Sequence, residues 1–430
     1  MRVIKKIKFD NISLFKNQLL NWAQSYDELV WLDSNQHREN YSEFDAVLAV
    51  DALSYIKTDY KSAFSRLEDY RNSVSDWIFG YLAYDLKNDL ENLQSNNFDA
   101  VNFPDLYFFH PKKIFMFNNN DLIISYVAGF ENLIREDLEN IKKISIFNNS
   151  KNYSPKLTIN ERINKSEYIS KVKKLRDHIQ RGDIYEVNFC KEYFSHGNID
   201  PLKTFLDLQS ISKPPFSVYL KNNFLYLLSA SPERYLKKQG DLIVSQPIKG
   251  TARRSSNIFE DKKLREKLFA SPKERSENVM IVDLVRNDLS RIATKGSVKV
   301  EELHKTYTFE QVHHLISTVK AVKRAEVSVL DVITKSFPMG SMTGAPKISA
   351  MKIIERIEKT KRGLYSGAVG YFSPDNNFDF NVVIRSILYN AKNSYVSFSV
   401  GSAITIDSDP VKEYEECLVK AEAMRSVLEN

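Results

Sequence analysis

The sequence predicts an α+β fold in which large mixed or antiparallel sheets carry helices packed on their outside. Segments of alternating apolar residues, which are typical of strands, follow one another through short turns at several places along the chain. Longer segments with apolar residues at helical spacing lie between these groups of strands. Because several strands are joined directly rather than through a helix, a doubly wound parallel sheet is disfavoured.

Length and composition are those of a globular protein. The 430 residues could form two or three average domains, or one large α/β domain with an appendage. The hydrophobic share of 43% and the charged share of 27% are ordinary for such a protein. No apolar run approaches the roughly 18 residues of a membrane span, so we expect no membrane association. The basic start, residues 1–10, lacks a following apolar block and is not a secretory signal.

Cysteine content and charge disfavour several classes of protein. The two cysteines, Cys190 and Cys417, make a disulfide framework improbable and predict a reducing, cytoplasmic location. No Cys/His cluster has the spacing of a zinc site. The net charge of +6 could indicate nucleic-acid binding, but positive residues are interleaved with acids, as in 261–267. Without a basic stripe and stacking aromatics, we expect no nucleic-acid partner.

Chemistry-bearing motifs are unevenly distributed along the chain. No internal repeat is visible, and Asn-rich patches at 95–97, 118–120 and 148–152 are typical of loops. We place the main boundary at 147–156, between an N-terminal region (1–150) and a second region (160–428). The first region contains no useful cluster of carboxylates, histidines or glycines, whereas the second contains every motif described below.

The second region begins with a helix whose apolar residues recur from Tyr168 to Ile179 and which Gly182 ends. An alternating strand follows over 185–190, and another covers 224–230. A tight corner at 231–233 then leads through a hairpin at 239–241 into the strand before Lys249.

Two further helices have clear N-terminal signals. Ser271, Pro272 and Glu274 fit the cap, the first helical position and the capping box of a long helix. Asp409 and Pro410 begin the last helix in the same way. Between them lie a Gly-containing loop, a helix with apolar positions and three strands, expected at 338–347, 348–357, 366–373, 378–389 and 395–406.

Lys249 lies between the apolar strand 242–244 and a Gly250-Thr251 turn. Pro247 restricts the chain before it, and Gly250 allows the backbone to approach a ligand closely. A desolvated lysine in this position can lose proton affinity and act as an amine nucleophile. The alternative is an ordinary turn lysine that points into water.

Carboxylates share helical faces with lysine at two places. Glu413, Glu416 and Lys420 fall at i, i+3 and i+7 of the last helix, and Glu274 and Glu277 repeat the i, i+3 spacing on the long helix. Together they could hold one Mg²⁺, which favours one or two carboxylates with waters and ligand oxygens. The alternatives are a Glu416–Lys420 surface pair and, for Glu274, a capping role.

Arg385 and His314 lie in apolar surroundings. Arg385 falls within an apolar strand and needs an anionic partner, either an internal carboxylate or a carboxylate-bearing substrate. His314 has a satisfied core histidine as its simplest interpretation. The loop from Gly340 to Gly344 resembles a phosphate cradle, but its spacing to Lys347 does not fit a P-loop.

Taken together, these segments resemble the chorismate-utilising enzyme family. The matching motifs occur in family order over about 160–428: they are 231–234, 247–251, 277–284, 286–288, 314–317, 337–347, 365–368 and 415–420. The resemblance implies the anthranilate synthase component I-like fold. It also implies a chorismate-binding catalytic region at 160–428, preceded by a variable N-terminal region, residues 1–150.

Within this family, the residue before Gly250 sorts the subfamilies. Anthranilate synthases and isochorismate or salicylate synthases usually carry Ala there, whereas aminodeoxychorismate synthase component I carries Lys. Lys249 therefore resembles the latter, and implies attack of its amine on C2 of chorismate while Glu233 protonates the leaving C4 hydroxyl. Ammonia would then attack C4 and expel Lys249. His314 would lie near the ring.

The resemblance implies further roles for residues around the substrate. Mg²⁺ would be held by Glu277 and Glu416, with Glu274 and Glu413 behind them, and would bind the ring carboxylate. The remaining predicted contacts to the substrate carboxylates are Gly250, Thr251, Tyr365, Arg385, the Gly401 backbone and Lys420.

Two positions depart from the family pattern. Isochorismate-forming relatives place a lysine base at the position of Glu186, and amino-transferring relatives usually have Gln there. A carboxylate at this position could itself act as a base. The usual Gly-rich strand end reads Gly401-Ser402-Ala403 here, so only Gly401 is expected to contact the substrate.

The chain contains no glutaminase-like nucleophile motif. The resemblance therefore implies a glutamine amidotransferase subunit that supplies ammonia, and a downstream lyase that makes 4-aminobenzoate for folate. The alternatives are anthranilate synthase component I, or a catalytically inactive chorismate-binding homologue. Tryptophan binding by the N-terminal region stays open.

Overall fold

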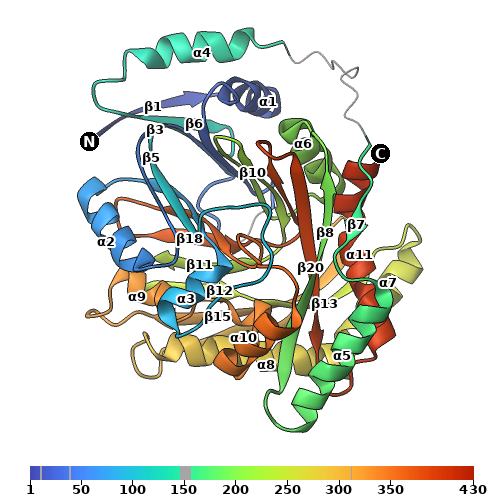
Figure 1. Ribbon diagram of the computed structural model, residues 1–430. Helices are drawn as coiled ribbons and strands as arrows, with labels where there is room; N and C mark the ends of the chain where they lie inside the picture. Colours follow the sequence, from blue (N-terminus) through green and yellow to red (C-terminus); the bar gives the residue numbers. More distant parts are fainter. Residues whose placement is uncertain (10–11, 38–39, 146–155, 311) are drawn as a thin grey trace.

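The computed structural model describes residues 1–9, 12–37, 40–145, 156–310 and 312–430. Its strands form one connected network of 20 strands, and every pairing between them is antiparallel. Helices surround this network on the outside (Figure 1). The prediction of an α+β fold with antiparallel sheets and helices packed outside is therefore confirmed.

The N-terminal region contributes long strands and short helices. Its strands are β1 (Arg2–Lys8), β2 (Glu28–Asp33), β3 (Ala46–Thr58), β4 (Ile78–Leu82), β5 (Leu106–Asn118) and β6 (Asp121–Val127). Its helices are α1 (Ile12–Ala23), α2 (Ala63–Val74), the 3-10 turn η1 (Tyr84–Leu86), α3 (Lys87–Leu90) and α4 (Leu133–Lys143).

The second region contributes the remaining elements. Its strands are β7 (Asn160–Glu161), β8 (Glu186–His196), β9 (Phe216–Asn222), β10 (Leu225–Ser231), β11 (Arg234–Gln239), β12 (Leu242–Gln246), β13 (Ile248–Arg253), β14 (Lys299–Thr308), β15 (Val312–Val322), β16 (Gly344–Ala345), β17 (Ala368–Phe372), β18 (Phe378–Val382), β19 (Ser386–Asn390) and β20 (Tyr395–Ile404). Its helices are α5 (Lys165–Gln180), α6 (Pro201–Ser212), α7 (Ile258–Ala270), α8 (Pro272–Ser290), α9 (Val329–Thr334), η2 (Gly340–Met342), α10 (Lys347–Ile357) and α11 (Pro410–Glu429).

The sheet network has two halves that are joined by the long strands β3 and β5. In one half β4 pairs with β17, which continues through β18, β11 and β12 to β15. In the other half β2 pairs with β9, which continues through β10, β19 and β20 to β8. Strands of the N-terminal region thus pair directly with strands of the second region. The predicted boundary at 147–156 falls, except for its last residue, outside the described residues.

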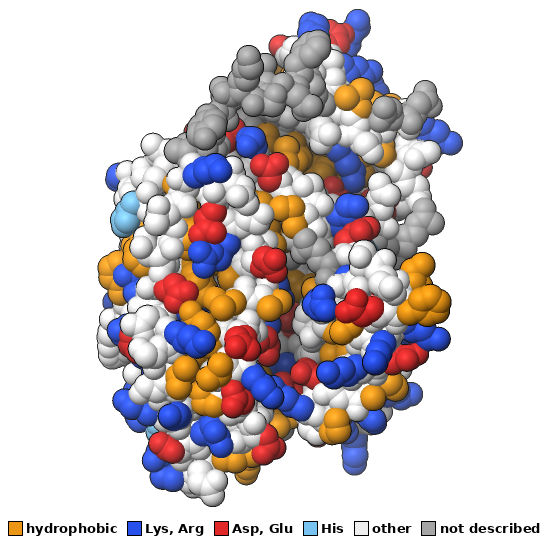
Figure 2. Space-filling view, turned by 90° about the vertical axis from the view of Figure 1, so that its right-hand side faces the viewer, with side chains coloured by type: hydrophobic (Ala, Val, Ile, Leu, Met, Phe, Trp, Pro, Cys, Tyr) orange, Lys and Arg blue, Asp and Glu red, His pale blue; other side chains and the backbone are white. Residues whose placement is uncertain are grey.

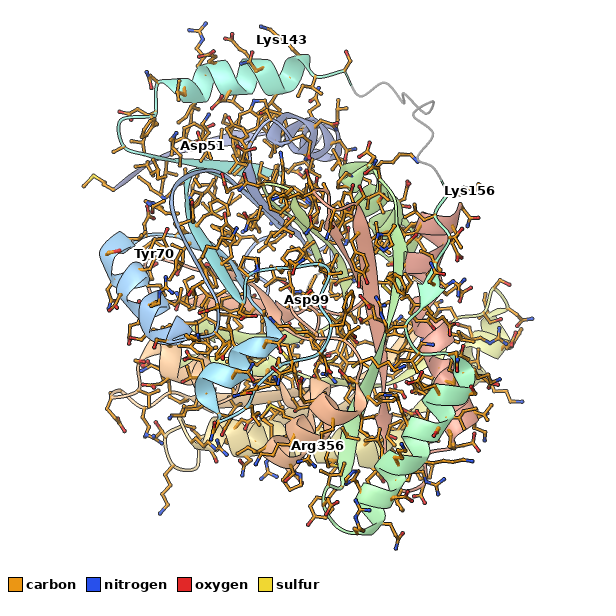
Figure 3. The ribbon with its side chains drawn as sticks, in the orientation of Figure 1. Asp51, Tyr70, Asp99, Lys143, Lys156 and Arg356 are labelled. Carbon is orange, nitrogen blue, oxygen red and sulfur yellow. The ribbon has the colours of Figure 1, made fainter. Side chains whose placement is uncertain are left out.

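The period-2 alternation of the strands divides the buried residues into two cores. Val30, Val218 and Leu227 face a core shared by both halves of the network. Their neighbours Trp31, Tyr219 and Leu228 instead face a second core beneath the helices, which include α1, α5, α6 and α11. The side chains in Figure 3 fill both spaces. Several strands are apolar without clear alternation because they are buried on both faces.

The predicted strand over 378–389 is wrong in one respect, because it is two strands. β18 pairs with β11 and β17 in one half of the network, whereas β19 pairs with β10 and β20 in the other. The chain must cross between the halves, and it does so at 383–385. Arg385 has a φ of 53° there, in the left-handed region. Arg385 therefore lies in a break rather than inside a strand.

The helix signals are largely confirmed. Ser271 caps α8 by accepting the Glu274 amide, and Asp409 caps α11, each followed by Pro in the first turn. The reciprocal half of the predicted capping box does not form, because the Ser271 amide donates to Leu268 instead. On α11 the buried stripe runs through Cys417, whereas the adjacent Leu418 is 37% exposed.

Charges on the surface are mixed. Figure 2 shows Lys and Arg interleaved with Asp and Glu over the face that carries α11 and α5, without a single-sign stripe. Among the described residues, no helix is both long enough and apolar enough to cross a membrane.

Candidate active site

The predicted site residues converge on one cavity of about 100 Å³. It lies where β13 and β20 meet α8, α11 and the loop at η2. Its lining includes twelve of the thirteen predicted residues: Glu233, Lys249, Gly250, Thr251, Glu274, Glu277, His314, Tyr365, Arg385, Gly401, Glu416 and Lys420. The thirteenth, Glu413, lies behind the lining. Residues far apart in sequence meet here because β13, β20, α8 and α11 pack around one point.

Lys249 projects from β13 into this cavity. The predicted Gly250-Thr251 turn is instead an irregularity within the strand, where the pairing of β13 with β15 shifts register. Gly250 has a φ of 95°, and a Cβ there would lie 3.0 Å from Oε2 of Glu274. Glycine is therefore needed both for the backbone conformation and for the approach of that carboxylate. The Lys249 side chain is 10% exposed, so it does not point into bulk water.

The expectation that the pKa of Lys249 is lowered is wrong. Burial alone would lower it, but the carboxylates of Glu186, Glu277 and Glu233 outweigh this effect and raise the pKa. The Nζ atom of Lys249 donates to Oε1 of Glu186 at 2.8 Å. Lys249 is therefore an ammonium ion in this arrangement, and attack on a substrate requires removal of a proton first.

Glu233 follows the corner at Pro232 and faces the same cavity. Its side chain is buried, and Oγ of Ser341 donates to its Oε1 at 2.6 Å. Burial raises the pKa of Glu233 to about 7, although the Ser341 hydrogen bond and the ammonium of Lys249 act in the opposite direction. A carboxyl with this pKa is partly protonated near neutral pH and can donate a proton.

Lysines pair with the carboxylates of α8 and α11, and one of them, Lys273, bridges the two helices. Nζ of Lys273 lies 2.9 Å from Glu413 and 3.8 Å from Glu277, and Lys420 lies 2.5 Å from Glu416. The predicted Glu416–Lys420 pair therefore forms, but both residues also line the cavity. Burial raises the pKa of Glu277 to about 8. For Glu416, burial is outweighed by the neighbouring ammonium groups, which lower its pKa.

The residues present fit a hard cation, although they are not assembled as ligands. Glu277 Oε1 and Glu413 Oε2 are buried and have no hydrogen-bond partner, so they are oxygens that a cation could satisfy. Among the described residues, no three His, Cys, Asp or Glu side chains converge closely enough to hold a metal. Mg²⁺ commonly uses one or two carboxylates and takes its other ligands from water and substrate. Two carboxylates from α8 and α11 meet that requirement.

Arg385 brings an unpaired positive charge to the cavity. Its Nη1 donates to the Lys420 carbonyl at 3.3 Å, and within the described part of the chain no carboxylate forms an ion pair with it. Burial lowers its pKa. Of the two partners considered from the sequence, the internal carboxylate is therefore not found. Tyr365 lies nearby, and burial raises its pKa well above the ordinary value, so its hydroxyl is a neutral donor.

His314 and Thr251 face each other across the pairing of β15 with β13. Nδ1 of His314 lies 3.0 Å from Oγ1 of Thr251. Burial, with the nearby Arg385 cation, lowers the pKa of His314 to about 3, so the ring is neutral. It cannot supply a proton as an imidazolium ion, but it can orient Thr251.

Gly401 of β20 and Lys420 of α11 also line the cavity. Nζ of Lys420 donates to the Gly401 carbonyl at 2.9 Å. A Cβ at position 401 would lie 2.6 Å from Sγ of Cys190, so glycine is required there by packing.

Comparisons with known proteins agree with this arrangement. A model of the chorismate binding enzyme family matches residues 15–426. The chain belongs to this family. It is 30% identical over 460 residues to aminodeoxychorismate synthase component 1 of Bacillus subtilis (strain 168), covering 99% of this chain and 96% of that protein. It is 32% identical over 395 residues to anthranilate synthase component 1 of Aquifex aeolicus, covering 88% and 79%.

The fold of this chorismate binding enzyme also matches a solved relative. The crystal structure of anthranilate synthase component I from Streptococcus pneumoniae TIGR4 superposes with a TM-score of 0.77 at 25% identity, covering 91% of this chain and 94% of that one. The prediction of an anthranilate synthase component I-like fold is confirmed. Relatives of both activities occur, so the comparisons settle the family and not the product.

Several residues of this chorismate binding enzyme's cavity were not predicted from the sequence. Ser341 contacts Glu233, Lys273 bridges two carboxylates, and Asn188, Met342 and Ile384 are among the other lining residues. Ser341 lies in the loop from Gly340 to Gly344, whose resemblance to a phosphate cradle was the available signal. Lys273 had none, because its position in the first turn of α8 is that of an ordinary surface lysine.

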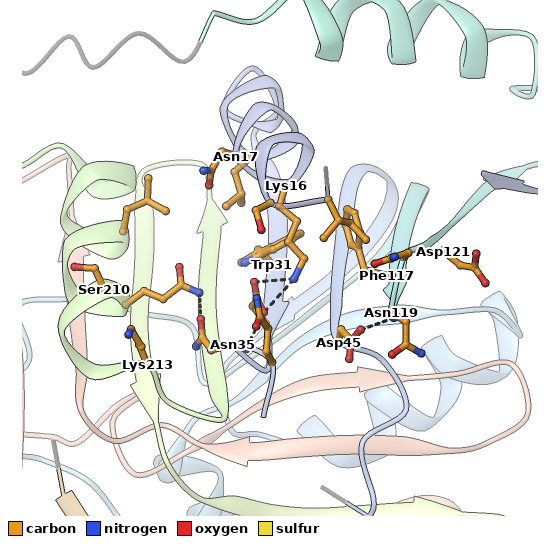
Figure 4. Close-up of a pocket in the computed structure, with 18 of the residues that line it drawn as sticks. Lys16, Asn17, Trp31, Asn35, Asp45, Phe117, Asn119, Asp121, Ser210 and Lys213 are labelled. Atoms are coloured by element: carbon orange, nitrogen blue, oxygen red, sulfur yellow. Dashed lines mark hydrogen bonds and ion pairs between the residues drawn. The ribbon is translucent and has the colours of Figure 1, made fainter. Parts of the chain in front are cut away.

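A larger hollow of about 1210 Å³ lies elsewhere, between α1, α6 and the turn joining β5 to β6 (Figure 4). Its polar groups largely satisfy one another. Lys16 pairs with Asp33, Gln209 donates to Asn35, and the Asn119 amide donates to Asp45. The smaller cavity instead holds the guanidinium of Arg385, which has no carboxylate partner among the described residues, beside buried carboxyl groups with shifted pKa values, which is why we assign the chemistry to it.

Proposed function

We propose that this chain is aminodeoxychorismate synthase component 1, which converts chorismate and ammonia into 4-amino-4-deoxychorismate. The observation that carries the proposal is the buried amine of Lys249, which shares one small cavity with the carboxyl of Glu233. The two groups supply a nucleophile and a proton donor, the pair that displacement of a poor hydroxide leaving group requires.

Substrate binding follows from the cations of the cavity. Chorismate carries a ring carboxylate and an enolpyruvyl carboxylate. Arg385, whose guanidinium has no carboxylate partner among the described residues, would pair with the enolpyruvyl carboxylate, assisted by the Tyr365 hydroxyl and the Gly401 backbone. Gly250, Thr251 and Lys420 would help to hold the substrate carboxylates.

The reaction proceeds in two displacements. The neutral amine of Lys249 forms a bond to C2, both conjugated ring double bonds shift by one position, and the C4 hydroxyl leaves as water with the proton of Glu233. Ammonia then forms a bond to C4, both ring double bonds shift back, and the bond between C2 and the Lys249 amine breaks. The enolpyruvyl group stays attached, and Glu233 recovers a proton from the new ammonium group at C4. His314 is neutral and orients Thr251 beside the ring.

We propose Mg²⁺ as the cofactor, with Glu277 and Glu416 as its ligands and Glu274 and Glu413 behind them. When bound, Mg²⁺ would neutralise the ring carboxylate of the substrate and hold it in place. The orphaned oxygens of Glu277 and Glu413 support this assignment. Lys273, which bridges these two residues, would have to release at least one of them.

We also propose the partners and location that this activity requires. Ammonia would come from a glutamine amidotransferase subunit, and a separate lyase would convert the product to 4-aminobenzoate for folate. Cys190 and Cys417 are both free and buried, which supports a cytoplasmic site of action.

Anthranilate synthase component I is the second candidate, because relatives with that name cover most of this chain. The two activities differ in their products. We expect purified protein with chorismate, Mg²⁺ and an ammonium salt to form 4-amino-4-deoxychorismate, detected by mass spectrometry, without release of pyruvate. Fluorescent anthranilate formed in the absence of a lyase would overturn the proposal, and no consumption of chorismate with a glutaminase partner would indicate an inactive homologue.

A further inference from the structure

Glu186 makes the closest polar contact of Lys249. It is the first residue of β8, and its Oε1 accepts the Lys249 ammonium at 2.8 Å from a position 63 residues away in sequence. The Glu186 side chain is 1% exposed. Its second oxygen, Oε2, is also buried and has no hydrogen-bond partner. A buried carboxylate with only one of its oxygens satisfied is costly, which calls for a functional explanation.

The backbone around Glu186 is fixed by the loop that also carries Ser341. Ala345 of β16 pairs with Glu186, and the Tyr185 amide donates to the Ala345 carbonyl at 2.7 Å. A Cβ at Gly344 would lie only 2.2 Å from the Glu186 carbonyl oxygen, so this loop packs directly against the start of β8. Backbone pairing with β16 therefore fixes the start of β8, from which the Glu186 side chain extends.

The remaining charged groups around Lys249 do not replace Glu186. Carboxyl groups of three other elements line the same cavity, as do two cations. These groups are Glu274 and Glu277 of α8, Glu416 of α11, Glu233 of the corner before β11, and the cations Lys420 and Arg385. His314, also in the lining, is neutral. Within the described residues, only Glu186 lies within ion-pair distance of the Lys249 Nζ.

We propose that Glu186 is the positioning residue of Lys249, holding it as an ammonium ion in the free protein and accepting its proton when the amine attacks. The proposal rests on the proposed function for the role of Lys249 as nucleophile. In the step itself, the N–H bond of the ammonium breaks, an O–H bond forms on Glu186, and the freed nitrogen electron pair forms the bond to C2. The proton returns to Lys249 when ammonia displaces it.

The geometry gives a physical reason for this arrangement. The cavity is small and Lys249 is buried, so bulk water is not available to take the proton. An acceptor at hydrogen-bond distance can take it without movement of either side chain. The unpartnered Oε2 leaves the carboxyl group free to carry a proton without breaking another contact.

The test measures the proton affinity of Lys249 without requiring turnover. The pH dependence of acetylation by acetic anhydride is followed at Lys249 by peptide mass spectrometry, with and without excess Mg²⁺, in wild type, Glu186→Gln and Glu186→Asp. Glu192→Gln is the matched control, because Glu192 is a buried carboxylate of the same strand that pairs with Arg162 instead.

We expect the labelling midpoint of Glu186→Gln to fall by roughly 1–3 pH units, the usual effect of one close opposite charge. Glu186→Asp should keep most of the wild-type midpoint, and Glu192→Gln all of it. The acid limb of the kcat/KM profile should move in the same direction as the midpoint.

An unchanged labelling midpoint in Glu186→Gln would overturn the proposal. An equal loss of activity at every pH, with the acid limb of the profile unmoved, would also overturn it. If Glu186→Gln does not fold, Glu186→Asp provides the test. A labelling midpoint below that of wild type would support the proposal, whereas a midpoint equal to that of the Glu192→Gln control would overturn it.

The two proposals can fail separately. A labelling shift together with release of anthranilate would leave the Glu186–Lys249 pair intact and refute the product assignment. Formation of 4-amino-4-deoxychorismate with no labelling shift would refute the role of Glu186 alone.

Discussion

Replacing Glu233 by Gln should inactivate the protein and yet stabilise it at alkaline pH. Gln keeps the size of the side chain and can still accept the hydrogen bond from Ser341, but it cannot donate an acidic proton to the leaving hydroxyl. Loss of a general acid typically costs a factor of about 10²–10⁴ in rate. We expect that decrease in kcat, with a much smaller change in KM for chorismate.

The stability change follows from the raised pKa of Glu233. Burial moves it from the ordinary 4.5 to about 7, a displacement worth about 3 kcal/mol. In acid the Glu233 carboxyl is protonated in both the native and the unfolded state, so its raised pKa does not lower the free energy of unfolding there. As the pH rises from the unfolded pKa through the folded one, the unfolded chain ionises first, so stability is lost. Glu233→Gln removes this loss. At about pH 8.5 its free energy of unfolding should therefore exceed that of wild type by up to about 3 kcal/mol.

Urea unfolding of both proteins at about pH 4.5 and about pH 8.5 measures this difference. The gain should be present at the higher pH and nearly absent at the lower one. Glu192→Gln provides the control, since it removes the negative charge that pairs with Arg162 at 3.0 Å and should destabilise the protein rather than stabilise it. An equal stability difference at both pH values would refute the assignment of a raised pKa to Glu233, and unchanged kcat would refute its role as the acid.

Three further predictions concern the cation site and the substrate carboxylate. Glu416→Gln should raise the Mg²⁺ concentration for half-maximal activity roughly tenfold or more, and an unchanged metal titration would refute the ligand assignment. Lys273→Met removes the ammonium that neutralises Glu277 and Glu413, so calorimetry should show tighter Mg²⁺ binding, whereas weaker binding would mean that Lys273 supports the site rather than competing for it. Arg385→Ala should raise KM for chorismate by a factor of about 10–100, the equivalent of one charge-assisted contact, and an unchanged KM would exclude a contact to the substrate.

Much of the fold could be predicted because its signals are local. The caps at Ser271 and Asp409 and the adjoining prolines mark the starts of α8 and α11 in the sequence itself. The break at Arg385 could not be predicted from the apolar residues around it. It depends on β18 and β19 belonging to different halves of the sheet network, which is a property of the whole fold.

The site could be predicted as a set of residues, but not as an electrostatic arrangement. Lys249 is buried as expected, yet its proton affinity is set by carboxylates that arrive from β8, α8 and the corner at Glu233. The local sequence indicates that Lys249 is desolvated, but it contains no information about these distant charges. It therefore predicts the wrong direction for the pKa shift of Lys249. Lys273 shows the same limit, because the Glu413 carboxylate that it contacts lies 140 positions further along the chain, on another helix.

The central claim is that Lys249 attacks the substrate covalently, and one mass measurement tests it directly. Protein incubated with chorismate and Mg²⁺, but without ammonia, is analysed intact and then as peptides. We predict an added mass equal to chorismate less one water, located on Lys249 and absent from Lys249→Ala. No added mass on the wild-type protein, or an adduct that persists in Lys249→Ala, would contradict the account.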